Sequence, residues 1–226
     1  MERIIKKLED LKNTKVEKQP PLPTENNVLK TFSIENEPVV ELVNNREREY
    51  TFADLPNIGY STDIDTVMAS SYQVKKQLQQ IVKIEQPITN TLLYKRILRI
   101  WNLTRVTTRL QVFIDSLLED AYKDPLSGDT IIYWEDKEKA KDCDFYRINS
   151  KRDILDIPIL EVMSAARYAI EQQISMPTED LKRLTSQLLG FSRKGNNLDM
   201  VTEHTIQLLI DKGIFSHANG MVSMNN

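Results

Sequence analysis

The sequence contains one helix-turn-helix pattern twice, in residues 86–121 and 176–213. In the first half of each copy the matching residues are separated by a constant offset: Leu93, Ile100, Trp101, Leu103 and Arg105 match Leu181, Leu188, Leu189, Phe191 and Arg193. We expect four extra residues around 195–198, after which Ile114, Leu117, Leu118 and Ala121 match Ile206, Leu209, Ile210 and Gly213. A repeat of this length predicts two similar units that pack against each other.

Length and composition bound the architecture. The 226 residues predict a leader or linker at 1–69, which we expect to be partly disordered, a first unit at 70–150 and a second at 151–226. With 40% hydrophobic and 28% charged residues, the chain is typical of a soluble globular protein, and no apolar run reaches the length of a membrane span. Residues 1–11 lack the apolar core of a secretory signal, and Cys143 is the single cysteine. We therefore expect a cytoplasmic protein without a membrane partner.

The leader carries weak structural signals. Residues 1–11 have apolar residues at helical spacing and predict a short amphipathic helix, or a frayed end. Residues 12–27 contain three prolines and predict an extended linker. Residues 28–66 show no sustained period, so we expect an irregular segment draped over the folded part.

Each unit has three predicted helices followed by β structure. The predicted helices cover 72–84, 89–101, 107–121, 159–173, a segment that starts at 177–179 and ends at Gly190, and 198–212. Residues 130–134 predict a strand, and residues 214–224, with Asn219 and Gly220 at the centre, predict a hairpin. This order is that of a winged helix. The predicted fold class is mainly α, with tandem winged-helix-like units behind an extended N-terminal leader.

Charge is segregated along the chain, although the net charge is only −3. The stretch between Glu85 and Asp115 has no acidic residue and five basic residues. The stretch between Asp180 and Asp199 has no acidic residue and four basic residues. These cations are Lys95, Arg96, Arg99, Arg105, Arg109, Lys182, Arg183, Arg193 and Lys194. Four or five phosphate contacts per unit predict weak, salt-sensitive nucleic-acid binding, with dissociation constants on the order of 10⁻⁴ to 10⁻⁶ M.

The candidate nucleic-acid-binding residues lie on the second and third helices and the turn between them, which approach the phosphate backbone in helix-turn-helix proteins. They are Lys95, Arg99, Arg105, Arg109, Arg193, Lys194, Asn196 and Asn197. The alternative is that these residues form solvated helix faces, and that the winged helices bind only protein.

Aromatic residues and catalytic motifs add little to this interpretation. Trp101 and Phe191 flank equivalent turns and predict packing roles, and at most one of Tyr133 and Trp134 is expected to face inward. Glycines 190 and 195 have phosphate-loop spacing without the following Lys and Ser or Thr. We expect no catalytic residue, metal or cofactor.

One weak alternative is a metal-dependent nuclease, because Asp129, Glu135 and Lys137 have the residue types of such a site. The carboxylates of a nuclease must converge on a metal, whereas these three lie along a short predicted hairpin and its edge. His204, His217 and Cys143 are too few for a structural zinc site.

Five segments of the chain resemble a bacterial family, the domain of unknown function 3320 family. The segments are residues 81–88, 96–105, 145–147, 157–162 and 188–195. Members of that family form the C-terminal module of large superfamily-one helicase-like proteins, often behind a Vsr-like endonuclease domain, and some are suspected of roles in phage defence. The resemblance implies a DNA-related setting and supplies no catalytic residues.

Together these observations predict a non-catalytic nucleic-acid-binding accessory module that binds DNA in preference to RNA and is associated with a helicase-like DNA-processing or defence protein. The alternative function is an adaptor that docks to a helicase or nuclease subunit. The given sequence shows no helicase core, so we expect a stand-alone relative, a truncated reading frame or the last part of a split protein.

Overall fold

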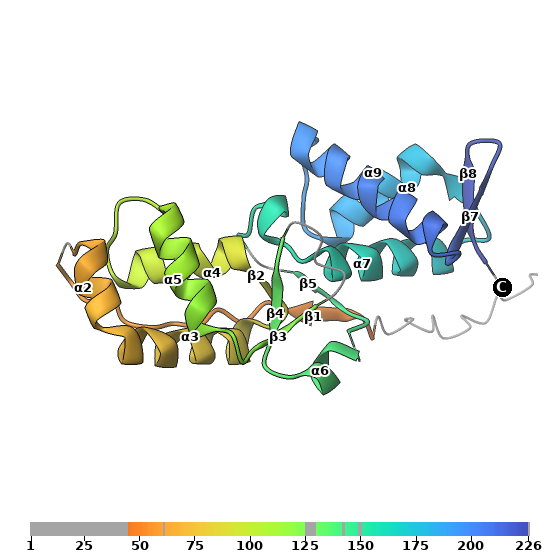
Figure 1. Cartoon of the computed structure of the whole chain (residues 1–226). Coiled ribbons are helices and arrows are strands. Elements are labelled where there is room, and N and C mark those ends of the chain that lie inside the picture. Colours follow the sequence, from red (N-terminus) through yellow and green to blue (C-terminus); the bar gives the residue numbers. More distant parts are fainter. Residues whose placement is uncertain (1–44, 61, 125–129, 142, 149–150, 226) are drawn as a thin grey trace, which may run out of the picture. The chain divides into compact units, whose positions relative to one another are not determined.

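The computed structural model describes residues 45–60, 62–124, 130–141, 143–148 and 151–225, which belong to one compact unit, Val43–Asn226. This part of the chain is mainly helical and carries small sheets (Figure 1). The expected fold class is confirmed at that level. The helix expected at 1–11 and the linker expected at 12–27 lie outside the described residues.

The first copy consists of three helices and a three-stranded antiparallel sheet. Its elements are α3 (Ser71–Glu85), β2 (Ile88–Thr89), α4 (Asn90–Ile100), α5 (Thr108–Leu117), β3 (Tyr122–Lys123) and β4 (Ile132–Trp134). The strand order is β2-β4-β3, so the last strand lies between the other two. The expected helices and the strand near 130–134 are confirmed; the short strand β2 was not predicted.

The second copy has the same elements in the same order. They are α7 (Ile159–Glu171), β6 (Met176–Pro177), α8 (Thr178–Leu188), α9 (Asn196–Asp211), β7 (Phe215–Ala218) and β8 (Met221–Met224). The sheet order β6-β8-β7 reproduces that of the first copy. Asn219 and Gly220 both have positive φ angles, 53° and 76°, as a tight two-residue hairpin turn requires. The predicted hairpin is therefore confirmed.

The constant offset between matching residues of the two copies continues further along the chain than the sequence comparison indicated. Asn90 at the start of α4 corresponds to Thr178 at the start of α8, 88 positions later, and Thr108 at the start of α5 corresponds to Asn196 at the start of α9 by the same offset. The expected insertion around 195–198 is therefore wrong. The additional length lies in α9 itself, which has 16 residues where α5 has 10.

The turn after the second helix is built identically in both copies. Asn102 (φ 49°) and Gly190 (φ 88°) occupy equivalent left-handed positions. The next amide closes the turn in each case: Leu103 N donates to Leu98 O at 2.9 Å, and Phe191 N donates to Ser186 O at 3.0 Å. This hydrogen bond is that of a Schellman C-cap, which ends a helix and redirects the chain.

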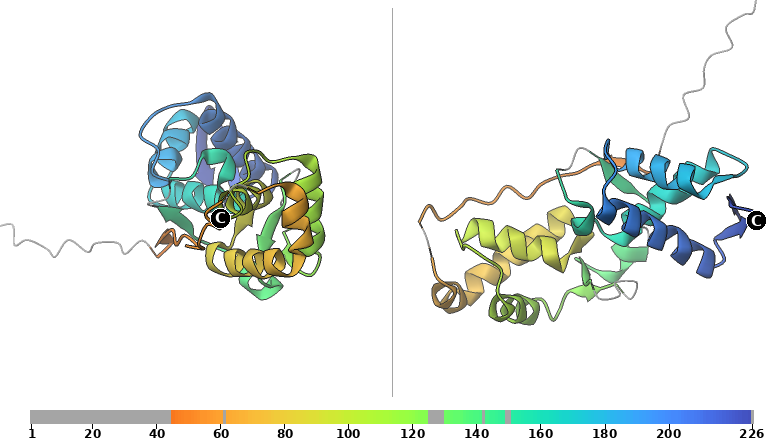
Figure 2. Two further views of the ribbon diagram at one scale, coloured as in Figure 1. Left: turned by 90° about the vertical axis from the view of Figure 1, so that its left-hand side faces the viewer. Right: turned by 90° about the horizontal axis from the view of Figure 1, so that it is seen from above.

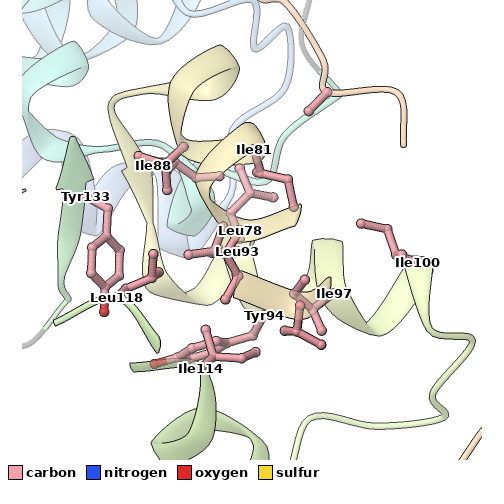
Figure 3. Close-up of a cluster of buried hydrophobic side chains, with 14 of the residues drawn as sticks. Leu78, Ile81, Ile88, Leu93, Tyr94, Ile97, Ile100, Ile114, Leu118 and Tyr133 are labelled. Carbon is pink, nitrogen blue, oxygen red and sulfur yellow. The ribbon is translucent and has the colours of Figure 1, made fainter. Parts of the chain in front are cut away.

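The core of the first copy lies where α3, α4 and α5 meet β2 and β4 (Figure 3). Leu78 and Ile81 of α3, Leu93 and Ile97 of α4 and Ile114 of α5 have no exposed surface. Complete burial of each such side chain contributes about 1.5–3 kcal/mol relative to exposure. The inward face predicted for α3, which consists of Val74, Leu78, Ile81 and Val82, is confirmed.

Both Tyr133 and Trp134 are buried, with 0% and 2% of their surfaces exposed, so the expectation that at most one faces inward is wrong. Strand β4 is central in its sheet, and both α3 and the short helix α6 (Lys137–Lys141) contact it. The Tyr133 hydroxyl reaches into the core and donates to Asp115 Oδ1 at 3.0 Å. Because the side chains of two successive residues of β4 are both buried, both faces of the strand are covered at this point.

A leading segment lies against the first copy. Strand β1 (Glu47–Glu49) pairs in parallel with β5 (Tyr146–Ile148), and helix α2 (Ile64–Ala69) follows. Residues 50–60 contain no helix or strand and run as an extended chain along the first copy (Figure 2, right). Ile58 N donates to Ile100 O at 3.0 Å, which ties this segment to the end of α4. Neither β1 nor α2 was predicted.

Candidate nucleic-acid interface

Several cations in the first acid-free stretch are neutralised by distant acids. Lys95 Nζ lies 2.6 Å from Asp156 Oδ2, and Asp156 is buried in a short 3-10 helix, Ile154–Asp156. Arg109 lies 2.7 Å from Asp65 in α2. The stretch itself contains no acidic residue, but the fold places acidic residues from other parts of the chain against it. Lys95 and Arg109 therefore contribute less positive potential than the sequence suggested.

Arg99 has an aromatic partner. Its guanidinium lies 4.9 Å from the centre of the Phe52 ring, in the leading segment, and the side chain is exposed. Asn57 Nδ2 donates to the Arg99 carbonyl at 2.6 Å, which fixes the backbone at this end of α4. The guanidinium is held against the protein while its charge remains unneutralised.

The second acid-free stretch is also partly neutralised. Lys182 is buried, and its Nζ lies 2.7 Å from Asp199, 3.2 Å from Glu179 and 3.6 Å from Glu203. Burial opposes the charge of Lys182, but hydrogen bonds from its ammonium group to Asp199 and Glu179 raise its pKa. Lys182 therefore joins α8 to α9 and is not available to phosphates. Arg183 also has a partner, because it lies 2.9 Å from Asp180.

Besides Arg99, which lies against Phe52, three of the expected basic residues are exposed and have no ion pair or hydrogen bond from the side chain within the described residues. They are Arg105, Arg193 and Lys194. Arg105 and Arg193 occupy equivalent positions, three residues before the third helix of each copy. These three residues form what we call the turn cations. Within the expected interface, these are residues of the two turns whose charges are exposed to solvent and are not neutralised by an ion pair among the described residues.

Asn196 and Asn197 are exposed in the first turn of α9. The N-cap residue of α9 is Gly195, which has no side chain to accept from the first amides, whereas Thr107 accepts from Leu110 N at the start of α5. The start of α9 therefore leaves backbone donors beside Arg193 and Lys194.

The third helices themselves are poor in positive charge. Helix α9 contains no Lys or Arg, and it exposes Asp199 and Glu203. Each third helix exposes an apolar residue: Val112 in α5 is 65% exposed, and Met200 in α9 is 59% exposed. These two residues are also 88 positions apart. The third helices of the two copies thus expose an apolar residue at equivalent positions.

The structure also contains a buried ion network that the sequence interpretation missed. Its first half surrounds Glu85, which has no exposed surface. Arg96 donates to both carboxylate oxygens from Nε, at 2.9 and 3.0 Å, and Ala53 N donates at 3.1 Å. The Tyr50 hydroxyl donates to the same carboxylate. Burial, and then the charge of Glu85, raise the pKa of Tyr50 to about 12.

The second half of the network surrounds Glu161, which also has no exposed surface. Arg147 donates to it at 2.5 Å and Arg152 donates at 2.8 and 2.9 Å. Burial alone would raise the pKa of Glu161, but Arg147 and Arg152 lower it to about 2. Arg147 also donates to the carbonyls of Glu85 and Pro87 at 2.7 and 2.6 Å. It therefore links the end of α3 in the first copy to α7 in the second.

A sequence signal for both carboxylates existed. Glu85 follows Ile81 by four positions and Leu78 by seven, so it lies on the buried stripe of α3. Glu161 precedes Ala165 by four positions and Ala169 by eight on α7. An acidic residue on an apolar stripe indicates a buried charge that needs partners.

The nuclease alternative gains no support from the described residues. Asp129 lies outside them. Glu135 bonds to Lys139 and Gln86, and Asp136 accepts from Lys139 N at the start of α6. Where the structure is described, no three His, Cys, Asp or Glu side chains cluster as metal ligands would. Over the same residues, every helix is too short or too polar to cross a membrane.

Residues 69–112 match the family described as "Protein of unknown function (DUF3320)". The match supports the family resemblance and covers less than half of the chain, from the start of α3 into α5. It includes Glu85 and Arg96 of the buried network and Lys95, Arg99, Arg105 and Arg109 of the expected interface. Comparisons with curated proteins and with solved structures found no match.

Proposed function

We propose that the chain is a non-catalytic accessory module of two winged helices that binds nucleic acid through the turn cations. The order of helix, strand, helix, helix and hairpin, with the last strand central in the sheet, supports the winged-helix assignment in both copies. The family resemblance supports a DNA-processing or defence setting beside a helicase-like protein. DNA is the preferred ligand in this proposal.

The observation that carries the proposal is the equivalence of Arg105 and Arg193. Each is exposed, unpaired within the described residues, and placed in the turn that leads into the third helix of its copy. Lys194 and the open amides at the start of α9 add donors beside Arg193. A phosphate backbone is the ligand that such turn cations recognise in helix-turn-helix proteins.

The contact is with the backbone and not with base edges. Helix α9 has no basic residue, and its Asp199 and Glu203 share the single positive charge of Lys182, so the helix presents net negative charge to the phosphates that flank a groove. Binding is therefore weak and largely independent of sequence. The two copies gain from being linked in one chain.

Salt dependence tests the proposal quantitatively. Each phosphate contact on duplex DNA gives a slope of about −0.9 in log Kobs against log salt concentration, so three turn cations predict a slope of about −3. The nine cations of the two acid-free stretches would give about −8. Fluorescence anisotropy with labelled duplex and single-stranded DNA at several salt concentrations measures this slope.

Charge-reversal variants test which residues contact the nucleic acid. Arg105→Glu and Arg193→Glu should each weaken binding and make the slope shallower by about one contact. Lys212→Glu is the matched control, because Lys212 is exposed and lies at the opposite end of α9, about 24 Å from Asn196. No binding at low salt, or equal effects of all three reversals, would refute the proposal.

A protein-binding adaptor is the second candidate, and the apolar residues Val112 and Met200 favour it. Exposed apolar residues at equivalent positions on two third helices suit contact with protein better than contact with phosphates. The partner in this candidate is a helicase or nuclease subunit encoded beside this chain. Val112→Asp with Met200→Asp should abolish co-purification with that subunit and leave DNA binding unchanged; the opposite pattern rules the adaptor out.

A further inference from the structure

A pocket of about 370 Å³ lies beside the turn that contains Arg193, one of the turn cations. Its lining comes from the turn after α8, from the first turn of α9, and from the start of the 3-10 helix Ile154–Asp156 with its N-cap residue Asp153. The volume lies within the range of pockets that hold small organic groups.

The buried part of the lining is apolar, and the exposed part is polar. Ile154 and Leu198 line the pocket and are 5% and 7% exposed. Phe191 is partly exposed: it packs against the core cluster that contains these two residues, and it also lines the pocket. The exposed side chains of Asn196 and Asn197 add amide donors and acceptors. Such a lining suits a planar ring that carries polar groups along its edge.

The two charged residues of the lining have different partners. Asp153 accepts from Leu155 N at 3.0 Å through one carboxylate oxygen, whereas Arg193 has no ion pair or side-chain hydrogen bond within the described residues. A ligand that satisfies both must offer an anionic group to Arg193 and N–H groups to Asp153. A nucleotide combines these features with a planar ring, because it carries a phosphate and a base whose edge includes N–H groups.

The first copy has an ion pair at the equivalent positions. Helices α3 and α7 begin 88 positions apart, and so do α5 and α9. By this offset Asp153 corresponds to Asp65, and Asn197 corresponds to Arg109. Asp65 and Arg109 lie 2.7 Å apart. The second copy has an amide in place of that arginine, so the carboxylate of Asp153 lacks the ion pair of the first copy.

Phe191 also differs from its counterpart, Leu103. The backbone amides of both residues close the turn after the second helix. Leu103 packs against the core of the first copy, so an aliphatic side chain suffices for this turn and for packing. The ring of Phe191 adds a flat surface on which a base can stack.

We propose that this pocket takes one unstacked base of a single-stranded nucleic acid. The base stacks against Phe191, an N–H group of its edge donates to Asp153, and the adjoining phosphate pairs with Arg193. Every base has a flat face and an N–H group, so this contact does not select a sequence. The proposal rests on the nucleic-acid binding proposed above. It adds that the second copy distinguishes single strands from duplexes, in which the bases are already stacked and paired.

Matched strands test the proposal with the full-length protein. Oligothymidylate and an abasic strand of the same length carry the same phosphates and differ only in their bases. By fluorescence anisotropy, the wild type should bind the oligothymidylate at least about fivefold more tightly, the lower end of what the stacking of one base contributes. Phe191→Leu, which installs the residue of the first copy, should remove this preference and leave duplex binding unchanged. Phe191→Tyr keeps an aromatic ring and should retain the preference.

Tyr72→Leu is the matched control, because it removes an exposed aromatic ring in α3 and should not change the preference. Unchanged duplex binding by Phe191→Leu shows that this variant is folded. The pocket proposal alone is overturned if the wild type binds both strands equally, if the preference persists in Phe191→Leu, or if Tyr72→Leu removes it as well. Absence of binding to the duplex and to both strands at low salt overturns the proposed function together with it.

Discussion

Glu161 is a fully buried carboxylate whose charge is balanced by Arg147 and Arg152. Removing the charge takes this counterion away from the buried guanidinium group of Arg147, which costs more than the loss of the ion pair alone. We predict that Glu161→Gln destabilises the protein by about 3–5 kcal/mol in urea unfolding. Glu203→Gln is the control, because Glu203 is exposed and 3.6 Å from Lys182; a similar loss in both variants would contradict the role assigned to Glu161.

The contribution of Glu161 to stability should also appear as a dependence of unfolding on pH. The folded-state pKa of Glu161 is about 2, below its ordinary value of 4.5. The stabilisation is therefore complete above pH 4.5 and disappears as the pH falls towards 2, because the unfolded chain takes up the proton first. This single group contributes roughly 3 kcal/mol across that window. Urea midpoints measured between pH 6 and 2.5 should fall steeply in the wild type and less steeply in Glu161→Gln.

Residue patterns allow some of these side chains to be predicted and not others. The period of α3 identifies its buried face, including the position of Glu85, but not which residue neutralises that carboxylate. The partners Tyr50 and Arg96 come from a leading segment without a helical or strand pattern and from the next helix. Likewise, the acid-free stretches are visible in the sequence, whereas Asp156 and Asp65 reach Lys95 and Arg109 only through the fold.

At the scale of elements, the left-handed residue after the second helix can be tested in both copies. Gly190 has φ 88°, and a Cβ there would touch nothing within 4 Å, so Gly190→Ala should cost only backbone strain, about 1 kcal/mol. Asn102 adopts the equivalent conformation, so Asn102→Gly should be neutral or slightly stabilising. Gly195→Ala is the control, because Gly195 has extended backbone and open space. Thermal melts compare the three; a loss at Gly195 as large as at Gly190 would contradict this account.

Local patterns also explain which elements were predicted. The six helices of the two copies have regular apolar stripes, and the Asn219–Gly220 turn is a local hairpin signal. Strands β2 and β6 have two residues each, too short for alternation to be visible. Strand β1 consists of Glu47, Arg48 and Glu49, so pairing with β5 and not composition makes it a strand.

For the molecule as a whole, we predict that Arg147 couples the unfolding of the two copies. It donates to carbonyls at the end of α3 and to Glu161 in α7. We predict one calorimetric transition for the wild type and two separate transitions for Arg147→Ala. Arg183→Ala should retain one, because among the described residues Arg183 pairs with Asp180 in its own helix and with no residue of the first copy. A single, slightly shifted transition in Arg147→Ala would show that other contacts couple the copies.

The parallel pairing of β1 with β5 also affects synthesis on the ribosome. Glu47 and its partner Tyr146 are 99 residues apart. At translation rates of about 5–20 residues per second, β1 emerges about 5–20 s before the strand that it pairs with. During this interval α3, α4 and α5 can already fold, while β1 has not yet gained the strand that it pairs with. Its three charged residues discourage pairing with the strands of other nascent chains.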